Sequence, residues 1–442
     1  MNPRRFIFLI VLLLLVGAAL SAQSWKAGVA KVDITPREPT WMAGYAARTK
    51  PSQGVLQPIY VKALALQDET GATSVLVTSD ILGFTPSMTN PIVQQVEVKY
   101  GIKRARLALT SSHTHSGPVT GQLLRPAYQI PKEQEEVVRR YTDRLVGQVV
   151  EVVGAAVQNL GPATLEFEQG LAGFAVNRRR VGLRHLPGPV DQDVPVLAVK
   201  SPDGKLRAVV FGYACHATTL DGYEISGDWP GFAQAALEKD YPGALALFIA
   251  GCGADTNPLP RRTVELARMY GDIAAEAVVQ TLKAKMVSVA GPLKTAFDLV
   301  DLPFAKTTRQ DYEKLLNNSH FMYRAYARQM LDTLDRDGKL PSGYAYPVQV
   351  WQFGNSMKII LLGGEVVVDY ALRLKAAHGW KNTWVAGYSN DVFAYIPSLR
   401  VLKEGGYEGG GAMVPYGQPG PFRTAVEEIV VEKVDELIGA TK

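Results

Sequence analysis

The sequence predicts a mixed α/β fold in which a β-sheet core is flanked by helices within one large domain. Short apolar runs of strand length alternate with longer segments whose apolar residues recur every three or four positions. The chain of 442 residues is 47% hydrophobic and 20% charged, which is an ordinary globular composition. No internal repeat or low-complexity linker divides it, so one domain over most of the chain is the simplest organisation.

The first residues have the pattern of a secretory signal peptide. Arg4 and Arg5 precede an apolar run over residues 6–20, and the small residues that follow end at Ala22. The run is too short to span a membrane comfortably. We therefore expect cleavage after Ala22, a secreted or periplasmic protein, and a domain over residues 23–442. An uncleaved membrane anchor is the alternative.

Charge and cysteine content narrow the class of protein. The 47 basic and 42 acidic residues give a net charge of +5, and it is spread along the chain without a long basic run. Nucleic-acid binding is therefore not expected. Cys215 and Cys252 are the two cysteines, and in an exported protein they form either one disulfide or two buried thiols.

The first third of the chain alternates strands with two helices. A turn over residues 68–71 separates two of the strands, and Gly161-Pro162 ends the longer helix. The expected strands are 29–34, 59–67, 74–79 and one starting near Arg106, and the expected helices are 90–99 and 133–160.

The remaining two thirds repeat this alternation. Residues 175–180 are interpreted as a basic loop and residues 404–411 as a flexible glycine loop. The expected strands are 164–169, 196–200, 206–213, 244–250, 346–353, 358–362 and 384–388, and the expected helices are 232–239, 264–283, 308–334, 366–378 and 424–437.

Residues 111–118 follow an expected buried strand and include two side chains that can bind a metal ion. His113 and His115 stand two positions apart there, in a chain with only six histidines. On an extended backbone, side chains two residues apart point to the same side, so these imidazoles can converge on one ion. Two hydrogen-bonded loop histidines are the alternative interpretation.

Two further candidates also follow expected strands. His216 stands at the exit of the strand 206–213, and a small glycine-rich turn over residues 253–258 follows the next strand. Such a turn lets backbone N–H groups approach a ligand closely. Glu365 follows the strand 358–362, where a carboxylate at the start of a helix is also common as a cap.

Together these motifs resemble the N-terminal catalytic domain of neutral ceramidases, the non-lysosomal ceramidase family. The resemblance runs in the same order over about residues 27–412, and its most specific part is Ser112-His-Thr-His-Ser-Gly-Pro118. The other matches are Ala27-Gly-Val-Ala-Lys-Val-Asp-Ile-Thr-Pro36, Asn177-Arg178, Cys215-His216, Ser226-Gly227-Asp228, Gly253, Gly364-Glu365, Ser389-Asn390, Tyr395 and Tyr407-Glu408-Gly409.

The resemblance implies a catalytic zinc ion. By it, the ligands would be His113, His115, His216 and Glu365, with Tyr395 as a further oxygen ligand. Three neutral imidazoles and one carboxylate are donors that suit Zn²⁺. Zinc with an open position would lower the pKa of a water molecule towards about 7 and polarise the scissile carbonyl.

The resemblance also implies catalytic residues beside the metal. Arg178 and Tyr407 match family positions that contact the substrate, where a guanidinium or a phenol could stabilise a developing oxyanion. Family ceramidases carry a Gly-Asp-Val-Ser-Pro-Asn turn whose serine is implicated in activity. Here the turn reads Gly253-Ala-Asp-Thr-Asn-Pro258, so Thr256 or Asp255 stands near that place. Thr256 is the candidate, and no nucleophile is assigned. The C-terminal immunoglobulin-like domain of characterised ceramidases is expected to be absent.

The expected function is hydrolysis of an amide bond in N-acylsphingosine or a related N-acyl substrate, either a lipid or another small molecule. Two alternatives stay open: a zinc hydrolase for esters or lactones, and a non-catalytic binding protein of the same fold. Peripheral contact with a membrane and the oligomeric state are also left open. A serine hydrolase is not expected, because no Gly-x-Ser-x-Gly motif frames a nucleophile.

Overall fold

The structure is a computed structural model, and it describes residues 25–180 and 188–442. The predicted signal peptide lies outside the described residues, so it stays a prediction. Among the helices that are described, none is long and apolar enough to cross a membrane.

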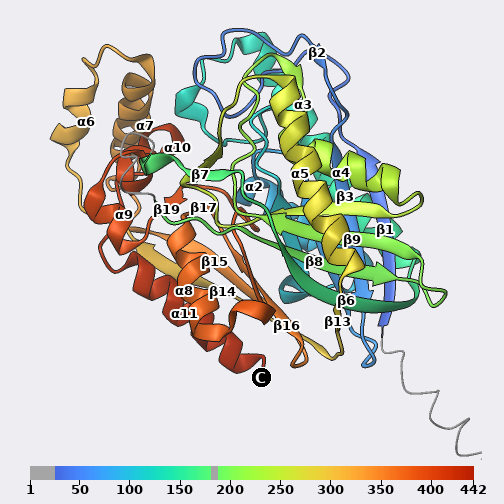
Figure 1. Ribbon diagram of the computed structural model, residues 1–442. Helices are drawn as coiled ribbons and strands as arrows, with labels where there is room; N and C mark the ends of the chain where they lie inside the picture. The colour runs from blue at the N-terminus through green and yellow to red at the C-terminus, as the bar shows by residue number, and fades with distance from the viewer. Residues whose placement is uncertain (1–24, 181–187) are drawn as a thin grey trace, which may run out of the picture.

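Two stacked β-sheets form the centre of the molecule, and helices cover both outer sides (Figure 1). The larger sheet has nine strands, which are β1 (Trp25–Asp33), β3 (Tyr60–Gln67), β4 (Thr73–Ser79), β5 (Leu107–Ser111), β6 (Gly161–Leu171), β8 (Asp193–Lys200), β9 (Leu206–Tyr213), β11 (Leu245–Ala250) and β13 (Val287–Ser288). The smaller sheet has four strands, which are β14 (Leu293–Pro303), β15 (Gly343–Phe353), β16 (Met357–Leu362) and β18 (Thr383–Ala386).

Both sheets mix parallel and antiparallel neighbours, as predicted. The larger sheet has the order β11-β9-β8-β6-β1-β3-β4-β5, with β13 paired to β6, and the smaller has the order β14-β15-β16-β18. The parallel pairs are β4 with β5, β9 with β11, and β16 with β18. Three two-stranded pairs complete the strands, namely β2 (Gly54–Val55) with β10 (Glu224–Ile225), β7 (Ala175–Asn177) with β12 (Thr256–Pro258), and β17 (Glu365–Val366) with β19 (Tyr395–Ile396).

The helices form the outer layers. Those packed on the larger sheet are α2 (Pro86–Tyr100), α3 (Lys132–Gln158), α4 (Asp228–Asp240) and α5 (Val264–Lys283), whereas α8 (Val368–His378) and α11 (Val426–Ala440) cover the smaller sheet (Figure 1). The rest are α6 (Arg309–Leu315), α7 (Phe321–Asp337), α9 (Leu399–Glu404) and α10 (Met413–Tyr416).

Alternating side chains along each strand separate the cores on its two faces. In β9, Phe211 joins the core under α4 and α5, while its neighbour Val210 joins the core between the sheets. The aromatic pair Phe167 and Trp384 connects the two sheets, with ring centroids 6.4 Å apart. Strands such as β9 and β11 therefore read as nearly continuous apolar runs, because both of their faces are buried, whereas β14 keeps an exposed face.

Four expected elements differ from the structure. The expected basic loop at residues 175–180 consists of β7 and a turn of 3-10 helix at Arg178–Arg180. The expected helix 308–334 is two helices, α6 and α7, each with its own N-terminal cap at Thr308 and His320. The expected glycine loop contains a turn of π-helix at Tyr407–Gly411. The helix expected from Val366 starts instead at Val368, because Glu365 and Val366 pair with β19.

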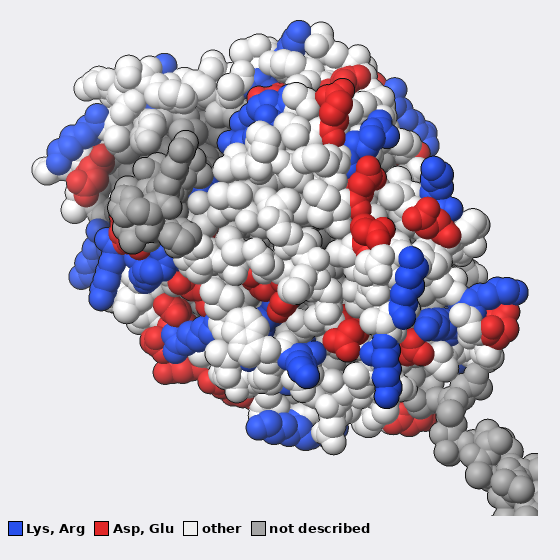
Figure 2. All heavy atoms as spheres, viewed as in Figure 1, with Lys and Arg blue, Asp and Glu red and all other residues white. Residues whose placement is uncertain are grey.

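Charges of both signs share the surface. Figure 2 shows basic and acidic side chains interleaved over the face in view, instead of basic side chains gathered in one patch. This distribution agrees with the spread of charge along the sequence.

Candidate metal centre

Strands of both sheets end where the candidate ligands lie. β5 leads to His113 and His115, and β9 leads to His216; all three come from the larger sheet. β16 of the smaller sheet leads to Glu365. The centre therefore forms at the carboxyl ends of parallel strands, where functional side chains commonly gather in α/β folds.

The turn after β5 brings its two histidines together by a route that the sequence did not predict. β5 ends at Ser111, and His113 has φ 58°, in the left-handed region. The expected extended backbone is therefore wrong, although the rings do converge, with centroids 4.9 Å apart. Left-handed backbone is uncommon for a residue with a side chain and clusters at functional sites. Gly44 permits the close packing, because a Cβ there would lie 2.5 Å from His115 Cγ.

Three histidines face one another at the centre. The ligand nitrogens of His113, His115 and His216 all lie within 4.8 Å of one another. His113 and His216 are each 1% exposed, and His115 is partly exposed. Burial lowers the pKa of His115 well below its ordinary value, and burial with the charge of Arg178 lowers the pKa of His216 to about 4. Both rings are therefore neutral at pH 7 and offer lone pairs to a metal.

Backbone carbonyls fix which nitrogen of two rings faces the centre. Nδ1 of His113 lies 2.6 Å from the Leu82 carbonyl oxygen, and Nδ1 of His216 lies 2.8 Å from that of Gly253. Each Nδ1–H donates to its carbonyl, which leaves the lone pair on Nε2. A hydrogen bond from the second ring nitrogen is what orients most metal-binding histidines.

A carboxylate oxygen faces these lone pairs. Oε2 of Glu365 lies 3.2 Å from His113 Nε2 and 3.0 Å from His216 Nε2. Burial alone would raise the pKa of the Glu365 carboxyl, but a proton shared with the adjacent imidazoles in the metal-free centre lowers it well below its usual range. Two nitrogen lone pairs and an ionised oxygen are all acceptors, and a cation between them satisfies all three.

Three of the spacings between candidate ligand atoms fit one small divalent cation. Nε2 of His113 and Nε2 of His115 are 3.2 Å apart, close to the two distances from Glu365. Ligand atoms placed about 2.0–2.1 Å from a tetrahedral zinc ion lie roughly 3.3–3.4 Å from one another. Nδ1 of His115 has no hydrogen-bond partner among the described residues, so that ring is the least constrained of the three.

Glu365 does not cap a helix. It lies in β17, in parallel register with Tyr395 of β19. The N-terminus of α8 is satisfied by another residue, since Val368 N–H donates to the Asp255 carboxylate at 2.9 Å. The alternative interpretation of Glu365 as a helix cap is therefore wrong. The strand pair places a carboxylate and a phenol side by side at the centre.

Three more predicted residues lie together beside the histidines. The Tyr395 hydroxyl is 3.3 Å from His216 Nε2 and accepts a hydrogen bond of 3.0 Å from Arg178 Nη2. Glu408 holds the same guanidinium, accepting from its Nε at 2.6 Å. The Tyr407 ring lies 5.2 Å from the Tyr395 ring and is 47% exposed. Tyr407 therefore forms part of the open side of the centre.

Thr256 is close in sequence to the centre, but its hydroxyl points elsewhere. Thr256 Oγ1 donates to the Ala214 carbonyl at 2.7 Å and lies 3.1 Å from the Gly253 carbonyl oxygen. These contacts hold the turn whose Gly253 carbonyl orients His216. A role of Thr256 in catalysis stays a prediction of the resemblance.

Sequence reasoning missed several side chains that support the ligands. Tyr416 donates a hydrogen bond to Glu365 Oε1, and the Tyr388 ring lies 4.4 Å from the His113 ring. Tyr45 packs on His115 with ring centroids 4.9 Å apart. All three tyrosines come from distant segments and stand among ordinary core residues in the sequence. No local pattern distinguishes them.

The two cysteines lie close to the centre in sequence and are both free. Cys215 and Cys252 are buried thiols. Burial raises the pKa of both, so they are uncharged at pH 7. Of the two forms left open by the sequence, the structure contains the buried thiols.

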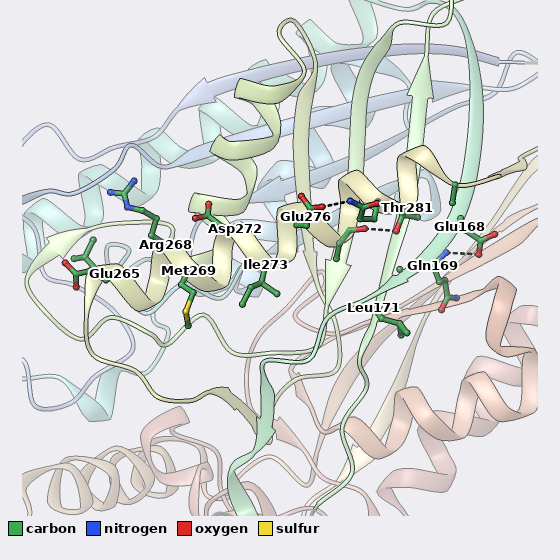
Figure 3. Close-up of a pocket in the computed structure, with 15 residues that line it drawn as sticks. Glu168, Gln169, Leu171, Glu265, Arg268, Met269, Asp272, Ile273, Glu276 and Thr281 are labelled. Atoms are coloured by element: carbon green, nitrogen blue, oxygen red, sulfur yellow. Dashed lines mark hydrogen bonds between the residues drawn. The ribbon is translucent and has the colours of Figure 1, made fainter.

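A separate groove runs along α5 and is not part of the centre. Its volume is about 970 Å³, and apolar side chains of Leu171, Met269 and Ile273 line it between acidic residues (Figure 3). None of the predicted site residues contributes to it. The candidate site is therefore defined by its chemistry and not by the size of a hollow.

Residues 25–257, just over half of the chain, match the family described as neutral/alkaline non-lysosomal ceramidase, N-terminal. The chain belongs to this family. Within the ceramidase match lie His113, His115 and His216, whereas Glu365 and Tyr395 lie beyond it.

Two fly ceramidases are similar to the chain. The neutral ceramidase of Drosophila pseudoobscura pseudoobscura is 25% identical over 243 residues, and that of Drosophila melanogaster is 24% identical over 243 residues. Each match covers 50% of this chain and 33% of the fly protein. The chain thus aligns with about a third of the length of these ceramidases.

Two solved ceramidase structures share the fold. Neutral ceramidase from Pseudomonas aeruginosa has a TM-score of 0.73 at 18% identity, covering 94% of this chain and 75% of that one. A structure described as ceramidase complexed with C2 has a TM-score of 0.71 at 18% identity, covering 94% and 76%. At this identity the likeness concerns the fold, and it confirms the predicted mixed α/β architecture.

Proposed function

We propose that this member of the ceramidase family is a zinc-dependent hydrolase that cleaves the amide bond of an N-acyl substrate. One observation carries the proposal: ring nitrogens of His113, His115 and His216 lie within 4.8 Å of one another, and Glu365 Oε2 lies 3.0 to 3.2 Å from two of them. Imidazole and carboxylate donors in this number suit Zn²⁺. When bound, zinc would lower the pKa of a water molecule towards about 7 and polarise the scissile carbonyl.

The residues around the ligands have separate roles in this proposal. Arg178 points its guanidinium at the centre and stabilises negative charge that develops on the carbonyl oxygen. Glu408 fixes that guanidinium, and Tyr395 supplies a hydroxyl next to His216. Tyr407, on the open side, contacts the substrate. Tyr416 orients Glu365 by donating to Oε1, and so limits the carboxylate to one rotamer.

The substrate class is also a proposal. The relatives are named neutral ceramidases, and one solved neighbour is described as a complex with C2, so a lipid amide is the starting hypothesis. The same ligands and the same guanidinium would also support ester hydrolysis. Export through the N-terminal segment is proposed together with this activity.

A hydrolysis assay with and without chelator tests the proposal. The substrates are a fluorogenic N-acyl sphingosine, a short-chain acyl amide and the ester matched to that amide. We expect the amides to be cleaved, cleavage to stop after chelation, and zinc to restore it. Preferred cleavage of the ester would favour the alternative bond class. Cleavage that persists in metal-free protein would contradict a zinc mechanism.

A further inference from the structure

A cavity opens beside the metal centre, on the side of Arg178. It has a volume of about 730 Å³, and its lining includes Arg178, Arg179, Arg261, Tyr407 and Glu408. Arg178 and Tyr407 line the cavity and also contact Tyr395. A molecule in this cavity is therefore within reach of the reacting centre. The lining is therefore part of what selects the substrate.

Most of the positive charge in this cavity is already paired. Glu408 binds Arg178 Nε through one oxygen and Arg179 Nη1 through the other, both at 2.6 Å. Arg179 also pairs with Glu404 at 3.1 Å. These two arginines and two glutamates form a network of paired charges, in which Glu404 also pairs with Arg400 at 3.2 Å.

Arg261 is the exception. It lies in the segment between β12 and α5, partly buried in the cavity lining. Within the described ranges 25–180 and 188–442, its guanidinium makes neither an ion pair nor a hydrogen bond, whereas the adjacent Arg262 pairs with Asp221 at 3.2 Å. Burial lowers the pKa of Arg261, and the charges of Arg262 and Arg178 lower it further, whereas Tyr45 and Asp221 act in the opposite direction. Arg261 thus bears a charge among like charges and partly away from water.

We infer that Arg261 binds an anionic group, a carboxylate or a sulfonate, on the N-acyl substrate that the metal centre cleaves. This inference rests on the proposed function and makes its substrate class narrower. A planar guanidinium with several free donors matches a carboxylate or sulfonate better than it matches the neutral hydroxyl groups of a sphingoid base. N-acyl amino acids and N-acyl aminosulfonates therefore fit this cavity better than ceramide does.

Paired substrates that differ by one charge test the inference. N-dodecanoylglycine is compared with the neutral N-dodecanoylglycinamide. In this pair the carboxylate lies on the amine side of the scissile amide. Glutaryl and valeryl p-nitroanilides form the second pair, with the charge on the acyl side. N-dodecanoyltaurine tests a sulfonate. We expect wild-type protein to prefer the anionic member of at least one pair by about ten-fold or more in kcat/KM, mainly through a lower KM.

Variants of Arg261 test whether this residue causes the preference for anionic substrates. Arg261→Gln should abolish the preference for the anion and leave kcat/KM on the neutral member within about two-fold, because the neutral substrate makes no ionic contact. Arg261→Lys should keep part of the preference. Arg268→Gln is the matched control, since it removes the same charge from an exposed position on α5, outside this cavity. We expect that variant to behave as wild type.

Two kinetic outcomes would overturn the inference without touching the proposed function. One is equal turnover of both members of each pair by wild-type protein. The other is an equal loss on anionic and neutral substrates in Arg261→Gln. If no compound is cleaved, calorimetric binding of N-dodecanoylglycine and its carboxamide decides instead. Tighter binding of the carboxylate that is lost in Arg261→Gln supports the inference, and equal binding overturns it.

Discussion

The protonation states of four side chains decide what the centre can bind. Because backbone carbonyls hold Nδ1–H of His113 and His216, their Nε2 lone pairs point at the Glu365 carboxylate. In a metal-free protein, acceptors at this spacing repel one another unless a proton bridges them. A divalent cation removes the repulsion and uses every lone pair. The facing lone pairs therefore favour a bound metal ion over a purely structural polar cluster.

Glu365→Gln separates these two possibilities. The amide keeps the size of the side chain and can donate to the imidazole lone pairs, so the metal-free protein should stay folded. Loss of the negative charge should weaken zinc binding by at least about ten-fold. Competition with a chromophoric chelator measures the affinity. Glu428→Gln, at an exposed pair with Arg373, is the control. Zinc affinity that is unchanged in Glu365→Gln would remove Glu365 from the ligand set.

Sequence reasoning identified the candidate ligand residues but not their geometry. The pair His113 and His115 was predicted from its spacing, His216 and Glu365 joined the set through the family resemblance, and the structure brings all four side chains together. The left-handed turn at His113 was not predictable, because the carbonyl of Leu82 and the space left by Gly44 come from other segments. Tyr416 was missed for the same reason.

At the scale of elements, strand ends and one short strand pair build the centre. Strands with both faces buried were recognised as apolar runs, and most helices were recognised by their three-to-four residue spacing. β17 and β19 were not, since two-residue strands leave no periodic pattern. Their pairing sets Glu365 opposite Tyr395. The prediction of a helix start at this point failed because tertiary pairing outweighed local propensity.

The loop after β18 contains a buried carboxylate that is not a candidate ligand. Asp391 is 6% exposed, accepts a hydrogen bond from the Tyr344 hydroxyl through Oδ2, and has no partner for Oδ1 among the described residues. Burial raises the pKa of the Asp391 carboxyl to about 7. Between about pH 4 and pH 7 the folded protein keeps a proton that the unfolded chain releases, so this group lowers stability as the pH rises through that window.

Asp391→Asn should therefore stabilise the protein more at high pH than at low pH. The amide keeps an acceptor for Tyr344 and cannot ionise. We expect its gain in unfolding free energy to grow by about 2 kcal/mol between pH 5 and pH 8. Urea denaturation at the two pH values measures the gain, with the exposed Asp337→Asn as control. A gain independent of pH, or a loss at pH 8, would contradict this assignment of the carboxyl.

At the scale of the whole molecule, the centre joins the two sheets. His113, His115 and His216 follow strands of the larger sheet, and Glu365 follows β16 of the smaller one. An isolated bridge between Gly251 and Ala386 also connects the sheets at this end. A bound ion would thus link segments far apart in the sequence and stabilise the folded protein as a whole.

Metal removal should lower the melting temperature. A ligand that binds only the folded state stabilises it in proportion to the logarithm of its free concentration over Kd. We expect chelation to lower Tm by roughly 5 °C or more and zinc to restore it. Differential scanning calorimetry measures the shift. The same Tm in the presence of chelator and of excess zinc would show that no ion links the sheets.

Metal analysis of purified variants tests the central claim most directly. Wild-type protein, His113→Ala, His216→Ala and the control His378→Ala, whose imidazole pairs with Asp435 at the surface, are compared for zinc per chain. We predict about one equivalent in wild-type protein and in His378→Ala, and almost none in the other two variants. Zinc content that stays at the wild-type level in His113→Ala and His216→Ala would contradict the claim that these imidazoles hold the metal.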